Sequence, residues 1–442
     1  MRRAKKTKPE ISQAVIDDKH LIHRNHHPIS KTNISANALA VLNQLNNAGF
    51  QAYLVGGSVR DLLLSKAPKD FDVTTNATPN QVRKLFRNAR IIGRRFKLVH
   101  ILYHREIIEV ATFRGSDAID ENHQTNDRGM VIRDNVYGTF EEDAWRRDFT
   151  VNSLYYTITN NAIVDFTNGF NDIHQRLIRM IGDPTTRYQE DPVRMLRAIR
   201  FSAKLNFNIE PKTASPISKL SELITHISGS RLFEEMVKLY QSGAAGSVQK
   251  QLVEYGLFAH LFPATHTLLA DKTYPVNAFL TLALQSTDKR IEENKPITPA
   301  FIFATLLWFP LLQRAAELET TGIDPLPALD QAMSSVITIQ NKIVTIPKRY
   351  TQVMREIWLM QFRFSKRSGS RAFSLLEDPR FRAAYDFMAL RALAGNESIE
   401  LADWWTTFQE VPLEKQQEMV DALALPVLSK PKRRRPKKKS IE

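Results

Sequence analysis

The feature that most constrains the fold is a glycine-glycine turn followed closely by two aspartates. The stretch Leu54-Val-Gly-Gly-Ser-Val-Arg-Asp61 precedes Asp70-Phe-Asp72. If residues 69–74 form a strand, Asp70 and Asp72 point to the same side of it, whereas Phe71 faces a core. Two carboxylates held this close repel each other unless a divalent cation lies between them. The pattern therefore predicts a strand that presents a pair of metal-binding acids.

The glycine turn itself is suited to phosphate. Gly56 and Gly57 allow the chain to turn sharply into a short helix, which Ser58 can cap. Backbone N–H groups at such a turn and helix N-terminus bind phosphate, and together with the acid pair they indicate metal-assisted chemistry on a nucleoside triphosphate. The alternative is a plain turn followed by a surface ion pair. The residues of this stretch that we expect to contact a nucleotide are Gly56, Gly57, Arg60 and Asp61.

A two-metal site, in which one metal activates a hydroxyl and the other steadies a triphosphate leaving group, needs a third acid. Two candidates are present: Glu109, in an expected strand at residues 107–113, and Asp148, in Arg146-Arg-Asp-Phe-Thr-Val-Asn-Ser153. The residues alone leave this choice open. Such a site also needs forked guanidinium donors for the triphosphate. The candidates for that role are Arg114, Arg146 and Arg147.

A second motif is Arg187-Tyr-Gln-Glu-Asp-Pro-Val-Arg-Met-Leu-Arg-Ala-Ile-Arg200. Asp191 followed by Pro192 predicts a helix N-terminus. Glu190 and Asp191 at the start of this helix, with Arg194 one turn on, offer donors and acceptors for the edge of a base. The alternative is an ion-paired helix surface. Arginines recur every three residues and form a basic stripe along one helix face: Arg194, Arg197 and Arg200.

The length of 442 residues predicts two to four domains. The order of strand and helix patterns predicts a mixed α/β unit followed by a helical body. In the first unit Ser35 is expected to cap a helix, and residues 98–103 and 107–113 form a hairpin. Residues 114–135 are polar and predict a mobile loop. Beyond about residue 183, strand signals fade and apolar residues follow helical spacing.

Composition narrows the class of protein. The chain has no cysteine, which excludes disulfides and thiolate zinc sites and fits a reducing cytoplasm. Its net charge of +14 favours a polyanionic partner, nucleic acid first and an anionic membrane surface second. The basic run at residues 430–439 predicts a disordered tail that touches nucleic acid. The longest apolar run, residues 300–312, is broken by Pro310 and is too short to span a bilayer.

These motifs, in this order, resemble the class II nucleotidyltransferases with a polymerase-β-like head, a family that comprises the bacterial CCA-adding enzymes and the bacterial poly(A) polymerases. The likeness extends over about residues 25–440. Within the family the chain looks most like the bacterial poly(A) polymerases. Besides the basic tail, the segments that support this are His27-Pro-Ile-Ser30, Pro68-Lys-Asp-Phe-Asp-Val-Thr-Thr-Asn-Ala-Thr78, Gly93-Arg-Arg-Phe96, Arg371-Ala-Phe-Ser-Leu-Leu-Glu377 and Arg382-Ala-Ala-Tyr-Asp386.

The resemblance implies an α+β fold class, in which a polymerase-β-like nucleotidyltransferase head with a mixed sheet and helices is followed by an all-helical neck, body and leg. The expected parts are a basic, disordered N-terminal segment, the head, a neck that recognises the base, an RNA-binding body and leg, and a basic disordered tail. Their expected bounds are residues 1–33, 34–180, 181–270, 271–428 and 429–442.

The resemblance also implies the chemistry, which is template-independent addition of AMP from ATP to RNA 3′ hydroxyl ends with Mg²⁺ or Mn²⁺ as cofactor. The implied catalytic acids are Asp70, Asp72, Asp148 and Glu109, with Asp70 and Asp72 on the metal. Asp148 could instead help to hold the ribose together with Asn152. The residues that would select the incoming base are Glu190, Asp191 and Arg194. The full expected nucleotide-binding set is Gly56, Gly57, Arg60, Asp61, Arg114, Arg147, Asn152, Glu190, Asp191, Arg194 and Arg197.

The implied partners are RNA 3′ ends and ATP, with RNA-decay proteins as further candidates and no stable transmembrane association. Tailing by such enzymes in bacteria is expected to promote RNA decay, and the expected location is the cytoplasm. Two alternatives stay open: CCA addition to tRNA, and a catalytically silent RNA-binding protein. The basic tail and the absence of a His-Asp metal motif in the helical body favour polyadenylation over CCA addition. The acid pair argues against a silent protein, because buried carboxylates without a role are costly.

Overall fold

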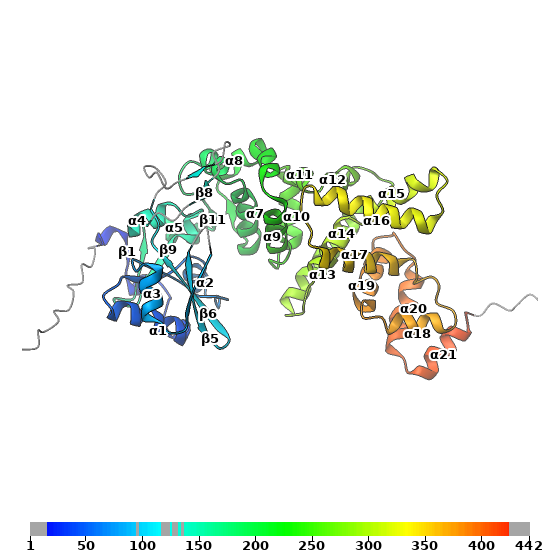
Figure 1. Cartoon of the computed structure of the whole chain (residues 1–442), viewed down its shortest axis with the longest axis horizontal. Coiled ribbons are helices and arrows are strands. Elements are labelled where there is room, and N and C mark those ends of the chain that lie inside the picture. Colours follow the sequence, from blue (N-terminus) through cyan, green and yellow to red (C-terminus); the bar gives the residue numbers. More distant parts are fainter. Residues whose placement is uncertain (1–15, 94–96, 116–123, 126–130, 134–136, 424–442) are drawn as a thin grey trace, which may run out of the picture. The chain divides into compact units, whose positions relative to one another are not determined.

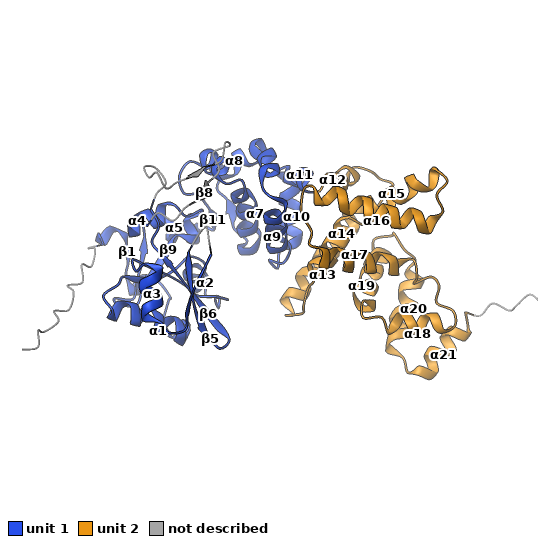
Figure 2. Ribbon diagram, viewed as in Figure 1, with its two compact units in different colours: residues 1–261 blue, residues 262–442 orange. Residues whose placement is uncertain are grey.

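The computed structural model describes residues 16–93, 97–115, 124–125, 131–133 and 137–423. The chain divides into two compact units, residues 1–261 and residues 262–442 (Figure 2). The predicted head and most of the predicted neck therefore lie in one unit, whereas the last residues of that neck, 262–270, belong to the second unit. The predicted tail at residues 429–442 lies outside the described residues.

The first unit is built on a mixed sheet (Figure 1). Its strands, in spatial order, are β1 (Leu21–Ile22), β10 (Ala162–Asp165), β9 (Leu154–Thr157), β2 (Ala52–Val55), β3 (Asp72–Thr75), β6 (Glu106–Thr112), β5 (Leu98–Tyr103) and β4 (Ala89–Ile92). Neighbouring strands of this sheet run antiparallel, except that β3 and β6 run parallel. The predicted hairpin is confirmed as β5 and β6.

Three helices accompany the first strands: α1 (Ala36–Asn47), α2 (Gly57–Leu63) and α3 (Pro79–Leu85). As predicted, Ser35 caps α1, because its side chain accepts a hydrogen bond from the backbone N–H of Ala38. Helix α1 contacts β3 and β6, whereas α3 contacts β4 and β5. These two helices cover one face of the sheet around the strand β3 that carries Asp72.

The prediction of a disordered segment at residues 1–33 is wrong for residues 16–33. Strand β1 pairs with β10 at one edge of the sheet, and Ile29 is 1% exposed. Nε2 of His27 contacts the backbone carbonyl of Asn161 at 3.0 Å. The segment is ordered because it adds a strand to an open sheet edge and buries apolar residues. Its short 3-10 helices are η1 (Asp18–His20), η2 (Arg24–His26) and η3 (Lys31–Asn33).

The rest of the first unit is mostly helical. The expected loop at residues 114–135 contains β7 (Gln124–Thr125) paired with β8 (Val131–Arg133), and its other residues beyond Gly115 lie outside the described part of the chain. A small parallel pair, β11 (Leu177–Ile178) with β12 (Asn208–Ile209), corrects the expectation that strands end near residue 183. The helices are α4 (Phe140–Trp145), η4 (Thr150–Asn152), α5 (Gly169–Gln175), α6 (Pro184–Glu190), α7 (Val193–Leu205), α8 (Pro211–Leu220), η5 (Ser221–His226), α9 (Gly229–Tyr240), α10 (Ala245–Glu254) and α11 (Leu257–Leu261).

The second unit is helical throughout its described residues. Its helices are α12 (Pro263–Leu269), α13 (Val276–Glu292), α14 (Pro299–Leu306), α15 (Trp308–Thr320), α16 (Pro325–Asn341), α17 (Lys348–Gln361), α18 (Ser370–Leu376), α19 (Phe381–Leu393), α20 (Ile399–Glu410) and α21 (Leu413–Asp421). The long apolar run forms α14 and the start of α15, where Trp308 is fully buried. Within the described ranges no single helix has the length and apolar character to cross a membrane, although α14 and α15 pass that test as a pair bent by 50°. The prediction of an α+β head followed by helices is confirmed.

Candidate active site

The two predicted metal-binding aspartates lie at the start of β3. Asp72 is the first residue of the strand, whereas Asp70 lies in the bend just before it, so the strand predicted at residues 69–74 begins later than expected. Both aspartates are exposed, and their neighbours Phe71 and Val73 are 7% and 1% exposed. The predicted alternation is therefore confirmed. The acids face solvent, where a cation can reach them, and the apolar side chains face the core.

Glu109 lies beside Asp72, because β3 and β6 pair with these two residues in register. Its carboxylate also lies 3.2 Å from Nε2 of His100, the residue aligned with it on β5. Neighbouring protein atoms displace part of the water around the carboxylate of Asp72. This desolvation, together with the charges of Glu109 and Asp70, raises the pKa of Asp72 to about 6, although the charge of Arg147 opposes the shift. Asp70, Asp72 and Glu109 thus form one acidic cluster.

The donor set of this cluster fits a hard divalent cation. In the part of the chain that the structure describes, no three or more His, Cys, Asp or Glu side chains form a metal-holding group by themselves. Mg²⁺ is commonly held by one or two carboxylates together with substrate phosphates, so Asp70 and Asp72 meet that requirement. A bound cation would also offset the repulsion that raises the pKa of Asp72.

The predicted glycine turn follows β2, the strand on the other side of β3. Gly56 has φ = +71°, and its N–H donates to the carbonyl of Leu154 at 3.1 Å. A Cβ atom on Gly56 would lie 3.6 Å from Nη1 of Arg147, which shows that this guanidinium borders the turn. Ser58 does not cap α2 as predicted; its hydroxyl donates to the carbonyl of Val55 at 3.1 Å, because α2 already begins at Gly57.

We expect Gly56→Ala to destabilise the first unit by about 1–3 kcal/mol, because a non-glycine residue is strained at this backbone conformation. Gly57→Ala is the matched control, since its φ is not positive and its added Cβ would meet only Nη2 of Arg60 at an ordinary 3.6 Å. Chemical denaturation of the two variants checks this. Equal stabilities would contradict the assigned strain.

Arg60 and Asp61 lie in a buried network. Arg60 is 3% exposed, and its Nη1 donates to Oδ1 of Asn152 at 2.6 Å. Its Nε and Nη2 donate to Oδ1 of Asp61 at 2.9 and 2.7 Å. The donors of Arg60 are therefore used inside the protein, where they hold the side chain of Asn152 in place.

Asp148 is held by the arginine stripe. Its Oδ2 lies 2.6 Å from the guanidinium of Arg197, and its Oδ1 accepts from the backbone N–H of Phe149 at 2.9 Å and from Nδ2 of Asn152 at 3.3 Å. Burial acts to raise the pKa of Asp148, but the ion pair with Arg197 and these hydrogen bonds lower it overall. Asp148 thus stays ionised and joins the segment after α4 to helix α7.

Arg114 and Arg147 meet at one buried carboxylate. Nη2 of Arg147 donates to Oδ2 of Asp143 at 3.0 Å, and its Nε donates to the hydroxyl of Tyr155 at 2.9 Å. The backbone N–H of Arg114 donates to Oδ1 of the same Asp143 at 3.3 Å. Since the charge of Arg147 also acts on Asp72, this arginine connects the glycine turn to the acidic cluster.

The three predicted base-selecting residues gather at the start of α7. Oε2 of Glu190 accepts from Nη1 of Arg187 at 2.8 Å and from Nη1 of Arg194 at 2.7 Å. Oδ2 of Asp191 lies 2.8 Å from Nη2 of Arg231 on α9. Ion pairs with neighbouring arginines therefore hold the donors and acceptors of these residues in place. The alternative interpretation, an ion-paired helix surface, predicts the same contacts.

Sequence reasoning gave no role to Arg187. Its Nη2 donates to the backbone carbonyls of Arg146 at 2.6 Å and Arg147 at 2.9 Å, and its Nη1 donates to Glu190. It therefore links the segment that carries Asp148 to the residues predicted to select the base. The available signal was that Arg187 begins the motif that also contains Glu190, Asp191 and Arg194.

Sequence reasoning also missed Phe201. The guanidinium carbons of Arg60, Arg197 and Arg200 lie 5.4, 5.3 and 4.9 Å from the centre of its ring. Aromatic rings attract cations, so one ring gathers three arginines from α2 and α7. The only signal in the sequence is that Phe201 directly follows the arginine stripe.

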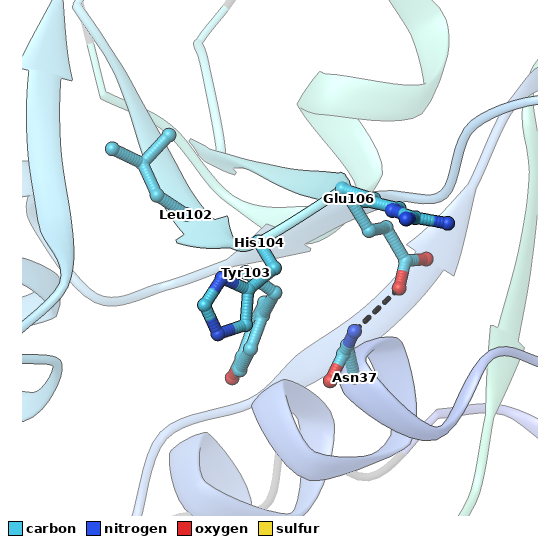
Figure 3. A pocket seen from close by; sticks show the side chains of 6 residues that line it. Asn37, Leu102, Tyr103, His104 and Glu106 are labelled. Carbon is cyan, nitrogen blue, oxygen red and sulfur yellow. Dashed lines mark hydrogen bonds between the residues drawn. The ribbon is translucent and has the colours of Figure 1, made fainter.

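A separate surface pocket lies at the turn of the β5–β6 hairpin and holds none of the predicted site residues (Figure 3). In it, Nδ2 of Asn37 donates to Oε2 of Glu106 at 2.6 Å. The lining residues are Asn37, Leu102, Tyr103, His104, Arg105 and Glu106.

The fold and the acidic cluster define the class of the protein. A solved structure of the Bacillus stearothermophilus CCA-adding enzyme in complex with CTP matches with a TM-score of 0.55 and 25% identity, over 87% of this chain and 82% of that one. Three family models match: the Poly A polymerase head domain at residues 52–179, the probable RNA and SrmB-binding site of polymerase A at residues 206–269, and the polymerase A arginine-rich C-terminus at residues 321–439. The chain is therefore a nucleotidyltransferase.

The relatives narrow this class. Poly(A) polymerase I of Salmonella typhi is 47% identical over 428 residues, which are 95% of this chain and 92% of that protein. A CCA-adding enzyme of Lactobacillus helveticus is 42% identical over 202 residues, which are 46% of this chain and 49% of that protein. The chain belongs to the poly(A) polymerase I family, as the motifs predicted.

Proposed function

We propose that this chain adds AMP from ATP to the 3′ hydroxyl of RNA without a template. The observation that carries the proposal is the extent of the sequence likeness, which reaches 95% of the chain for a poly(A) polymerase I and 46% for a CCA-adding enzyme. Tailing of RNA in the cytoplasm, leading to RNA decay, is the cellular role that we propose with it.

We assign the metal to Asp70 and Asp72, and we assign the third acidic position to Glu109. When bound, Mg²⁺ or Mn²⁺ activates the attacking hydroxyl and neutralises charge on the triphosphate. The register of β3 with β6 supports the choice of Glu109, because it holds this carboxylate beside Asp72. The ion pair of Asp148 with Arg197 supports a different role for Asp148, which is to position α7 and, with Asn152, the ribose.

The turn at Gly56 and the guanidinium of Arg147 form the side of the site that suits the triphosphate. Both lie toward β2, next to Asp72, and Arg147 turns its Nη1 and its positive charge toward this turn. In the reaction the 3′ oxygen of RNA bonds to the α-phosphorus of ATP and loses its proton. The bond from that phosphorus to the bridging oxygen breaks, and pyrophosphate leaves.

Incubation of the purified protein with an unstructured RNA, Mg²⁺ and each nucleoside triphosphate separately tests this function. We expect a long ladder with ATP alone, and no ladder on the same RNA with a blocked 3′ hydroxyl. Addition of C, C and A that occurs only on tRNA would support the CCA-adding alternative. No extension under any condition would contradict the proposal and support an RNA-binding protein.

We assign recognition of the adenine to Glu190, Asp191 and Arg194, and Arg194 gives the clearest prediction. Arg194→Ala should raise KM for ATP about tenfold, the effect of losing one charge-assisted hydrogen bond, and should reduce the preference for ATP over CTP. Arg194→Lys is the matched variant, because it keeps the charge but loses the planar fork. A Lys variant that selects ATP normally would contradict readout by the fork. Steady-state kinetics with both nucleotides checks this.

A further inference from the structure

The strand register places four polar side chains in one row across four neighbouring strands. Asp72 on β3 is aligned with Glu109 on β6, Glu109 with His100 on β5, and His100 with Arg90 on β4. Aligned residues on neighbouring strands point to the same face of a sheet. The acidic cluster is therefore one end of a row that reaches the edge strand.

This face of the sheet is open. The residues of the same strands that point to the other face are buried against the core, among them Val99 and Val110, each 1% exposed, on the side where α1 and α3 pack. On the open face, by contrast, Ile107 is 52% exposed and Ile92 is 44% exposed. The polar row thus runs between exposed apolar side chains.

The charge changes sign along the row. Asp72 and Glu109 are acidic at one end, and Arg90 is exposed at the other end. Among the residues that the structure describes, no carboxylate lies within ion-pair distance of Arg90. Strands are spaced by about 4.8 Å, so Arg90 lies roughly 14 Å from Asp72 in the hydrogen-bonding direction. The last nucleotides of an extended single strand can bridge that span.

Different groups lie on the two sides of Asp72 along the sheet. Toward β2 lie the turn at Gly56 and Arg147, which we have assigned to the triphosphate. Toward β4 lies the row that ends at Arg90. In phosphoryl transfer the attacking and leaving oxygens lie on opposite sides of the reacting phosphorus, so the two substrates approach the acids from different directions.

We propose that the open face formed by β6, β5 and β4 binds the 3′-terminal nucleotides of the RNA primer. Arg90 contacts a phosphate of the primer, and Ile92 and Ile107 contact its sugars or bases. The 3′ hydroxyl then lies at the acidic end and the phosphates trail toward the basic end. This subsite rests on the proposed function, since it names where that function takes its RNA.

The test compares Arg90→Ala with Arg83→Ala, which removes the same charge from an exposed position on α3, the helix that packs on the opposite face. We expect Arg90→Ala to raise KM for a short RNA primer about tenfold, the effect of losing one charge-assisted contact, without changing KM for ATP. The slope of log affinity against log salt should fall by about 0.7 in magnitude. Arg83→Ala should change none of these quantities.

A second variant, Ile107→Glu, adds an acid to the open face at a position that is already 52% exposed, so the fold should tolerate it. It should weaken primer binding as well. Equal primer KM and RNA affinity for the Arg90 and Arg83 variants would overturn the subsite, as would an increase in KM for ATP alone. If the unmodified protein extends no RNA, the proposed function fails. Fluorescence anisotropy of an RNA oligonucleotide with the same variants then decides separately whether this face binds RNA.

Discussion

Asp72→Asn should abolish extension of RNA and leave the fold intact. Asparagine has nearly the same size as aspartate, and the side chain is exposed at the start of β3, so packing changes little. What changes is the charge. A neutral amide cannot hold a divalent cation between itself and Asp70, and metal-assisted stabilisation contributes several kcal/mol to such reactions. We expect kcat to fall by about a thousandfold or more, measured by primer extension with ATP.

RNA binding separates loss of chemistry from loss of structure in this variant. Removal of a negative charge beside a polyanion cannot weaken its attraction, so RNA affinity should stay equal or increase. Glu106→Gln is the matched control, because it neutralises another acid on β6 whose partner, Asn37, can still donate to the amide oxygen. An Asp72→Asn enzyme with normal kcat would show that the chemistry lies elsewhere in the chain.

The sequence predicted the acid pair and its neighbourhood well, because the signals there are local. Alternation of Phe71 and Val73 with the two acids, and the cap at Ser35, depend only on residues close in the chain. The order at residues 16–33 could not be predicted in this way. Strand β1 has two residues, which is too short for a periodic pattern, and its partner β10 lies more than a hundred residues later.

The roles of the charged residues were harder to predict, since they depend on contacts between distant segments. Arg60 looks like a surface cation in the sequence, but Asn152 and Phe201 enclose it from two other parts of the chain. His100 is a different case. The predicted hairpin already brings strands 98–103 and 107–113 together, and a two-residue turn at residues 104–105 would have aligned His100 with Glu109. That register was available from the sequence.

The motifs left open whether Glu109 or Asp148 is the third acid. Substitution of Glu109 is the second change from which we expect a large effect on activity. We expect Glu109→Gln to lower kcat by about a hundredfold or more at unchanged stability, because it removes charge beside Asp72. We expect Asp148→Asn to act mainly through structure. It leaves the guanidinium of Arg197 without its carboxylate at 2.6 Å, and breaking a largely buried pair costs about 3 kcal/mol in unfolding free energy.

Arg197→Met makes this distinction testable, since it removes the other half of the same pair and keeps a long side chain against Phe201. If Asp148 acts by holding α7, then Asp148→Asn, Arg197→Met and the double variant should show similar losses of stability and similar increases in KM for ATP, because residues that act as a unit are not additive. Denaturation and steady-state kinetics on the three proteins measure both quantities. If Asp148 instead binds metal, Asp148→Asn should lose far more kcat than Arg197→Met, and Glu109→Gln should remain active. That result would exchange the roles assigned to the two acids. Loss of a metal ligand lowers kcat, whereas loss of a residue that positions α7 lowers stability and raises KM for ATP.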